Sequence, residues 1–156
     1  MNALGKPPCL LDINIVLDYL QQREPWYPLA KALFLAEGQE KVVLYISANT
    51  VATIHFLIRR KDSRKKALAK IEMLLGRLRI ADVTGAVIAR ALKLGLDDLE
   101  DAIQASAAME SGIPVLVTRD TKDYGRMESL QVLPPEIALA AIKLQVPRIR
   151  EPILPR

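Results

Sequence analysis

The architecture follows from a repeated unit whose first example is Cys9-Leu10-Leu11-Asp12-Ile13. This short apolar run has the length of a buried strand, and a helical pattern over residues 14–22 comes directly after it. Two similar runs recur later, Val42-Val43-Leu44-Tyr45-Ile46 and Pro114-Val115-Leu116-Val117-Thr118. Because strands separated by helical crossovers pair in parallel, the sequence predicts an α/β fold in which helices cover both faces of a parallel sheet.

The remaining predicted elements complete one domain. Short strands at 78–83 and 131–133 would bring the sheet to four or five strands. Helices are expected over residues 28–37, 63–75, 84–94 and 99–110. A further helix should begin at a cap formed by Ser47 or Asn49 and run to about Arg60. The last helix should begin at Pro134 or Pro135 and end at Ala141. Residues 1–142 are therefore predicted to form a single domain. Residues 143–156 hold three prolines and three arginines, and proline cannot continue a helix, so an extended arm is expected there.

Composition limits the class of protein. Hydrophobic residues make up 51% of the 156 residues and charged residues 26%, a globular balance that excludes intrinsic disorder. No apolar run approaches the roughly 20 residues that span a bilayer, and no signal peptide is apparent at the N-terminus. Cys9 is the single cysteine, so no internal disulfide is expected and a cytoplasmic protein is predicted. Aromatic residues make up only 4%, which disfavours base-stacking platforms.

Basic residues are concentrated between Arg59 and Arg79. This segment contains nine basic and two acidic residues, a net charge of +7 in a chain whose total is +4. Such a surface attracts polyanions, and RNA is the expected partner. An apolar stripe on the helix at 63–75, formed by Ala67, Leu68, Ile71, Leu74 and Leu75, is expected to pack and to leave the charges outward. The candidate nucleic-acid contacts are Arg59, Arg60, Arg64, Lys65, Lys66 and Lys70. A solvated helix face without a partner is the competing interpretation.

Acidic residues occur where the predicted strands end and where one helix begins. Asp12 ends the first strand and Asp120 follows the strand at 114–118, so both are expected at the same edge of the sheet. Asp98 and Asp101 share one face of a helix start, and Asp123 follows in a loop. Singly, each acid has a structural explanation, such as a turn or the helix dipole. Jointly they would need a cation, and Mg²⁺ or Mn²⁺ prefers such oxygen ligands and supports phosphodiester hydrolysis.

Four segments, in this order along the chain, resemble the motifs of PIN-domain proteins. They are Leu10-Leu11-Asp12-Ile13-Asn14-Ile15-Val16-Leu17-Asp18, Ile46-Ser47-Ala48-Asn49-Thr50-Val51-Ala52-Thr53-Ile54, Leu99-Glu100-Asp101-Ala102-Ile103-Gln104-Ala105 and Leu116-Val117-Thr118-Arg119-Asp120-Thr121-Lys122-Asp123-Tyr124. Each motif is weak by itself, whereas the ordered set, which lies within roughly residues 9–139, is fairly specific.

The resemblance implies a three-layer α/β/α fold and ribonuclease activity that depends on Mg²⁺ or Mn²⁺. Many bacterial members of this family are toxins paired with an antitoxin, so an antitoxin is an expected partner beside RNA, and a second copy of the chain is a further candidate. By position, Asp12, Asp101 and Asp120 would be the catalytic, metal-binding acids, with Asp123 as an auxiliary ligand. Asn14 would orient Asp12 or a bound water, and Thr118 would support the site.

One position departs from the family pattern. The second motif of active members usually carries a glutamate where this chain has Thr53, so one carboxylate of four is missing. Asp98 or Asp123 could compensate, and three acids suffice for one Mg²⁺ that keeps several waters. The alternative function is a degenerate PIN domain that binds nucleic acid or a protein without cleaving RNA.

Other classes of protein fit less well. An aspartate-nucleophile phosphatase would need a second aspartate two positions after Asp12, where the chain has Asn14, and no glycine-rich motif of a nucleotide-binding fold is present. His55, the single histidine, is expected to be structural because no second metal-binding histidine or cysteine accompanies it. Trp26 is expected to pack locally.

Overall fold

The computed structural model describes residues 5–125 and 127–145 and contains one parallel sheet. Its strands run in the order β3-β2-β1-β4-β5, and every neighbouring pair is parallel. The strands are β1 (Pro8–Leu11), β2 (Val43–Ser47), β3 (Arg79–Ala81), β4 (Val115–Val117) and β5 (Gln131–Leu133). The predicted parallel sheet is confirmed, with five strands.

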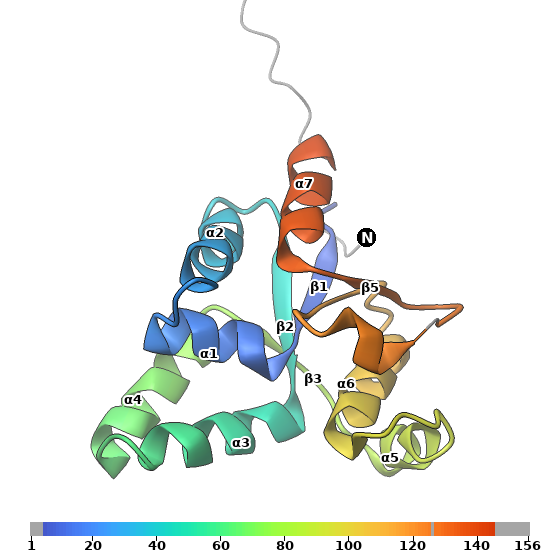
Figure 1. Ribbon diagram of the computed structural model, residues 1–156, viewed down its shortest axis with the longest axis horizontal. Helices are drawn as coiled ribbons and strands as arrows, with labels where there is room; N and C mark the ends of the chain where they lie inside the picture. The colour runs from blue at the N-terminus through green and yellow to red at the C-terminus, as the bar shows by residue number, and fades with distance from the viewer. Residues whose placement is uncertain (1–4, 126, 146–156) are drawn as a thin grey trace, which may run out of the picture.

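Helices cover both faces of this sheet, which gives the expected three layers (Figure 1). They are α1 (Ile13–Gln21), α2 (Tyr27–Gly38), α3 (Ala48–Arg59), α4 (Arg64–Leu75), α5 (Gly85–Ala91), α6 (Leu99–Glu110) and α7 (Pro135–Gln145), with a short 3-10 helix η1 (Thr121–Tyr124). The α5–α6 pair packs on one face, and α1 to α4 with α7 pack on the other. None of these helices is long and apolar enough to cross a membrane.

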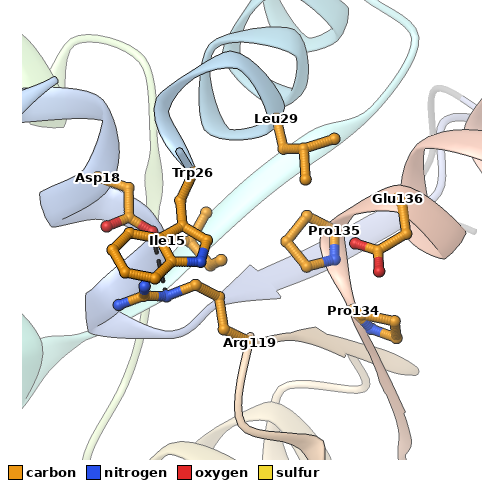
Figure 2. Close-up of a pocket in the computed structure, with 8 residues that line it drawn as sticks. All are labelled: Ile15, Asp18, Trp26, Leu29, Arg119, Pro134, Pro135 and Glu136. Carbon is orange, nitrogen blue, oxygen red and sulfur yellow. Dashed lines mark ion pairs between the residues drawn. The ribbon is translucent and has the colours of Figure 1, made fainter. Parts of the chain in front are cut away.

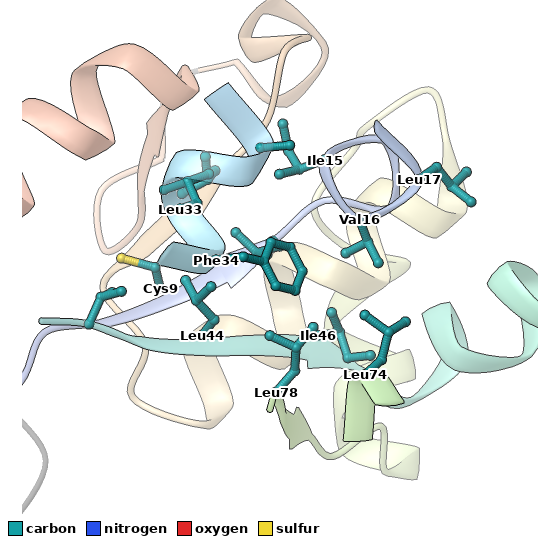
Figure 3. Packing of buried hydrophobic residues seen from close by; sticks show 14 of the residues in the cluster. Cys9, Ile15, Val16, Leu17, Leu33, Phe34, Leu44, Ile46, Leu74 and Leu78 are labelled. Atoms are coloured by element: carbon teal, nitrogen blue, oxygen red, sulfur yellow. The ribbon is translucent and has the colours of Figure 1, made fainter. Parts of the chain in front are cut away.

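Two hydrophobic cores lie on opposite faces of the sheet. Successive residues of β1 belong to different cores, because successive side chains of a strand point to opposite faces of the sheet. Leu11 belongs to the larger core and Leu10 to the smaller one, and both are fully buried. In the larger core, the ring of Phe34 stacks on Tyr19 with the ring centroids 3.8 Å apart. Figure 3 shows Phe34 among the aliphatic side chains of this core. Cys9 is buried in the same core, where burial raises the pKa of its thiol to about 12, so it packs as a small apolar residue.

The first strand is shorter than predicted, and the difference defines the position of Asp12. The strand was expected to reach Ile13, whereas β1 ends at Leu11 and Ile13 already begins α1. Asp12 is the N-cap residue of that helix, with an extended backbone, and its carbonyl accepts hydrogen bonds from the amides of Ile15 and Val16. The chain therefore turns at the acidic residue itself, between a buried strand and a buried helix.

Two other expectations were only partly correct. Ser47 stands at the N-cap of α3, but its hydroxyl bonds the hydroxyl of Thr50 at 2.8 Å instead of the helix backbone. On α4, Ala67 and Leu74 are buried as predicted, whereas Leu68 and Leu75 are 42% and 43% exposed. The helix packs chiefly against α3, so its buried face is narrower than the stripe in the sequence.

The C-terminal helix is longer than expected. α7 continues to Gln145 instead of ending at Ala141, and the remainder of the predicted arm lies outside the described residues. At the other edge of the fold, β3 covers only Arg79–Ala81 of the expected 78–83, and α5 ends at Ala91.

Candidate functional site

The site lies at the carboxyl edge of the sheet, where β1 and β4 end side by side. These strands pair in register, with Leu11 opposite Val117, and the amide of Asp12 donates to the carbonyl of Val117 at 2.9 Å. Thr118 and Asp120 follow β4 at the same edge. Asp12 and Asp120 line one cavity at this edge, as the sequence predicted, and the negative charge of Asp120 raises the pKa of Asp12.

Asp12 is the most enclosed acid of this site, with an exposure of 3%. The hydroxyl of Thr118 donates to its Oδ2 at 3.0 Å, and the amide nitrogen of Gln104 donates to its Oδ1 at 3.2 Å. Burial raises the pKa of Asp12, and the negative charge of Asp120 adds to the rise, whereas the hydrogen bonds lower it. Both carboxylate oxygens therefore have a fixed orientation toward the cavity edge.

The start of α6 contributes three further acids. Asp98 is the N-cap, and its Oδ1 accepts from the amides of Glu100 at 2.7 Å and Asp101 at 3.2 Å. The hydroxyl of Tyr124 donates to Asp101 at 3.1 Å. Burial is the main cause that raises the pKa of Asp101 to about 6; the bond from Tyr124 lowers it, and the charges of Asp12, Asp98 and Asp123 contribute to the rise.

The cavity enclosed by these groups has a volume of about 190 Å³. No basic residue is among the described side chains that line it. Its lining consists of Asp12, Ile13, Asn14, Asp98, Glu100, Asp101, Gln104, Thr118, Asp120, Asp123 and Tyr124. The structure thus brings together the predicted residues Asp12, Asn14, Asp98, Asp101, Thr118, Asp120 and Asp123.

The residues of the cavity fit a hard divalent cation that retains water. Glu100 Oε1 and Gln104 Oε1 are both buried there and accept no hydrogen bond from the described residues. Within the described part of the chain, no group of three or more Asp, Glu, His or Cys side chains is arranged so that it could hold a metal ion without water or other ligands. Mg²⁺ is commonly held by one or two carboxylates with several waters, which is the arrangement that this cavity suits.

Sequence reasoning missed three residues that organise the cavity. Gln104 follows Asp101 by three positions, and this spacing on a helix could have placed both on one face. Tyr124 lies within the fourth motif but was not selected, because its role depends on η1 folding back beside α6. Glu100 was not selected beside Asp101, although its side chain also lines the cavity.

A second pocket is lined by Arg119, the residue between Thr118 and Asp120 in the chain (Figure 2). Its volume is about 240 Å³. Arg119 turns away from the acidic cavity, stacks over the ring of Trp26 at 3.9 Å and places its Nε 3.2 Å from Oδ2 of the fully buried Asp18. Trp26 therefore packs locally, as predicted, while remaining 43% exposed. These contacts fix the backbone between the two site residues.

The predicted nucleic-acid residues lie outside the acidic cavity. Arg59, Arg60, Arg64 and Lys65 are exposed at the end of α3 and the start of α4, which lies away from α6 (Figure 1). Lys70 is bound to Asp62 at 2.9 Å, and Lys66 lies 3.8 Å from the same carboxylate. Because Lys66 and Lys70 share this acidic partner, the four other residues form the more accessible basic surface. His55 is half-buried and lines no part of the acidic cavity.

Comparisons with known proteins agree with this geometry. The family model of the PIN domain matches residues 8–122. VapBC2 from Rickettsia felis, bound to a DNA fragment from its promoter, has a similar structure with a TM-score of 0.63 and 20% identity, over 81% of this chain and 98% of that one. DNA-bound VapBC from Salmonella typhimurium gives a TM-score of 0.63 and 16% identity, over 83% and 98%.

A third similar structure is VapC20 from Mycobacterium tuberculosis, described as a Sarcin-Ricin loop cleaving toxin. It matches with a TM-score of 0.57 and 16% identity, over 69% of this chain and 86% of that one. No curated protein matches the chain in sequence at a significant level. At these identities the structural likeness establishes the fold, and chemistry must be argued from the residues.

Proposed function

The chain belongs to the PIN-domain family, and from this premise we propose that it is an endoribonuclease that depends on Mg²⁺ or Mn²⁺. The observation that carries the proposal is the acidic cavity at the sheet edge, in which Asp12, Asp101 and Asp120 face one another without a basic neighbour among the described lining residues. Such a concentration of carboxylates is unfavourable in the absence of a cation, because burial and mutual repulsion both oppose ionisation.

The residues have separate roles in this proposal. Asp12, Asp101 and Asp120 would hold the cation, with Asp123 as an auxiliary acid at the exposed rim. Thr118 and Gln104 keep Asp12 oriented, and Asn14 lines the cavity close to it. A bound divalent cation supplies Lewis-acid chemistry, since it polarises a phosphoryl oxygen and lowers the pKa of water.

Charge on the flank of the molecule suits a polyanionic substrate. Arg59, Arg60, Arg64 and Lys65 are exposed on α3 and α4, and phosphate contacts require cations without regard to base sequence. Thr53 lies on the same helix as Arg59, six residues earlier, which is about 9 Å along the helix axis. RNA bound along α3 would therefore pass from the basic surface toward the acidic cavity.

An RNA cleavage assay tests the proposal. We expect the purified chain to cleave mixed RNAs in the presence of Mn²⁺ or Mg²⁺ but not in the presence of a chelator. Asp12→Asn should lower the cleavage rate by about 100-fold or more, because several kcal/mol of charge stabilisation in the transition state depend on the metal. Asp97→Asn removes the same charge from an exposed position outside the cavity lining and should retain the rate. Equal rates in Asp12→Asn and the parent would contradict the proposed site.

A second candidate function is supported by Thr53. A hydroxyl stands where active relatives carry a carboxylate, so a PIN domain that binds RNA or a protein without cleaving it is the alternative. RNA binding by the parent, with no metal-dependent cleavage and no effect of Asp12→Asn, would favour this function.

The role of a toxin in a toxin-antitoxin pair is part of the proposal. It is supported by the similar folds of the VapBC complexes from Rickettsia felis and Salmonella typhimurium. Induction of the chain in a bacterial host should arrest growth, and Asp12→Asn should relieve the arrest. Unchanged growth on induction of the parent, with the protein present and folded, would argue against toxicity.

A further inference from the structure

Glu100 is a carboxylate of the acidic cavity whose surroundings differ from those of the other acids. It is the second residue of α6, and its half-buried side chain lines the acidic cavity. Burial raises the pKa of Glu100, and the charges of Asp98 and Asp12 raise it further. The hydroxyl of Thr53 acts on this carboxyl by lowering its pKa, while it donates a hydrogen bond to the carbonyl of Asn49 at 3.4 Å.

Glu100 also has an unsatisfied oxygen. Its Oε1 is buried and accepts no hydrogen bond from any described residue. A second buried acceptor without a donor lies in the same cavity: Gln104 is fully buried, and because its amide nitrogen donates to Asp12, its Oε1 is left without a partner. Buried acceptors without donors are unfavourable, and two of them on one cavity indicate a missing electropositive group.

The other acids near α6 are less suited to supply a further ligand. Asp98 Oδ1 is occupied by two backbone amides of the helix start. Asp123 is exposed on η1, where its oxygens are open to solvent. Sequence reasoning named these two as substitutes for the carboxylate absent at Thr53, whereas Glu100 is the acid that the structure brings against Thr53 itself.

We propose that Glu100 is a further ligand of the divalent cation, and that its carboxylate replaces the one absent at Thr53. This inference rests on the proposed function, because it assigns one more residue to the same metal site. The carboxylate absent from α3 is then supplied by α6.

Manganese binding in the absence of RNA tests the assignment. Mn²⁺ titrations followed by electron paramagnetic resonance and calorimetry should show that Glu100→Gln binds Mn²⁺ about ten- to 100-fold more weakly than the parent, a range seen even for residues that act on metal ligands indirectly. Asp97→Asn, which removes a charge three positions away at an exposed site, should bind Mn²⁺ nearly as the parent does. Parent-like Mn²⁺ affinity in Glu100→Gln would overturn the inference and leave the proposed function intact.

Thermal unfolding in a chelator separates a ligand from a structural residue. Glu100→Gln removes a partly buried charge among like charges, so the metal-free variant should melt at the same temperature as the parent or higher. In contrast, the rise in melting temperature on adding Mn²⁺ should be largely lost. A metal-free variant that melts well below the parent, with an unchanged Mn²⁺ response, would assign Glu100 a structural role.

A rescue variant gives the second test. Thr53→Glu in the Glu100→Gln background returns one carboxylate to the same side of the cavity and should recover most of the lost Mn²⁺ affinity. The two changes should be strongly non-additive, because they exchange one ligand position for another. Additive losses would overturn the inference. If the parent itself binds no Mn²⁺, both the proposed function and this assignment fail. If Mn²⁺ binding depends on Glu100 but RNA is not cleaved, the assignment stands and the non-cleaving alternative function holds.

Discussion

At the scale of single residues, neutral side-chain donors hold two of the carboxylates of the acidic cavity. Thr118 and Gln104 serve Asp12, and Tyr124 serves Asp101. These donors do not cancel the effect of burial, since the pKa of both acids stays above the ordinary value. The metal-free protein therefore carries charges that its own fold disfavours.

This arrangement makes the stability of the metal-free protein depend on pH. The pKa of Asp101 is about 6 in the native state and about 4 in the unfolded chain. Because the native state holds the proton more tightly, the stabilising contribution is full below about pH 4 and is lost as the pH rises through about 6. With a chelator present, the melting temperature should be higher near pH 5 than near pH 7.5.

Differential scanning fluorimetry at the two pH values checks this expectation. Asp101→Asn should reduce the difference in melting temperature, although Asp12 and Glu100 contribute in the same direction. Asp97→Asn changes a residue outside the cavity lining, so this variant should show the same difference in melting temperature between the two pH values as the parent. A parent that is more stable near pH 7.5 than near pH 5 would contradict the raised pKa.

The sequence allowed the site to be predicted only as far as backbone topology dictates. Asp12 and Asp120 could be paired because the carboxyl ends of parallel strands share an edge, and this holds for any side-chain packing. For Gln104 the spacing from Asp101 indicates only a shared face of α6, and whether that face points to Asp12 depends on the rotation of the helix about its axis. The same rotation decides whether Glu100 reaches the cavity. Side chains reached through helix packing leave only a weak signal in one sequence.

At the scale of elements, Arg77 joins parts of the chain that are distant in sequence. It follows α4 and bonds Glu37 of α2 at 2.7 Å, the carbonyl of Phe34 at 2.5 Å and the hydroxyl of Tyr19 of α1 at 3.2 Å. It also lies over the ring of Phe34 at 5.2 Å. One guanidinium thus ties the turn before β3 to two helices of the larger core.

We expect Arg77→Ala to lower the free energy of unfolding by about 1.5–3 kcal/mol, as for lost hydrogen bonds to charged groups. Arg77→Lys should recover only part of this loss, because a single ammonium cannot reproduce the forked contacts. Urea unfolding measures the free energy of unfolding of both variants. Arg79→Ala, at an exposed position of β3, is the control. Equal stability of Arg77→Ala and Arg79→Ala would show that the contacts contribute little.

The start of α4 determines the expected salt dependence of RNA binding. Arg64→Glu with Lys65→Glu reverses two exposed charges, and each lost phosphate contact should reduce the slope of log affinity against log salt by about 0.7. Filter binding across a salt series measures the slope. Lys93→Glu with Lys143→Glu makes the same change of charge at exposed positions elsewhere. Equal slopes in the two double variants would indicate that α4 carries solubilising charge only.

The packing of α4 shows where periodicity misleads at this scale. The sequence placed Leu68 and Leu75 in the packed stripe because their spacing is helical. In the structure, however, both side chains are more than 40% exposed. Periodicity indicates which residues share a face, but the width of the buried face depends on how many neighbours the helix has. With α3 as its main neighbour, α4 buries Ala67 and Leu74 and leaves the flanking leucines in solvent.

At the scale of the whole molecule, the two cores are joined by the strand that carries Asp12. Leu10 and Leu11 project to opposite faces of β1, and each is fully buried. Loss of the packing on either face would expose apolar side chains of a strand on which the other core also depends. The acidic cavity at the end of β1 should consequently form only when both cores are in place.

This coupling predicts that the domain unfolds as one unit. Leu10→Ala and Leu11→Ala should each lower the free energy of unfolding by about 2–5 kcal/mol, the range for leucines truncated in a core. Each variant should still unfold in a single transition, with coincident curves by far-ultraviolet circular dichroism and by fluorescence of Trp26, which packs beside the second pocket. Leu92→Ala, at a position 68% exposed, is the matched control and should change the stability little. Separate transitions by the two probes in Leu10→Ala would mean that the smaller core melts alone, and the cavity would then be lost before the larger core unfolds.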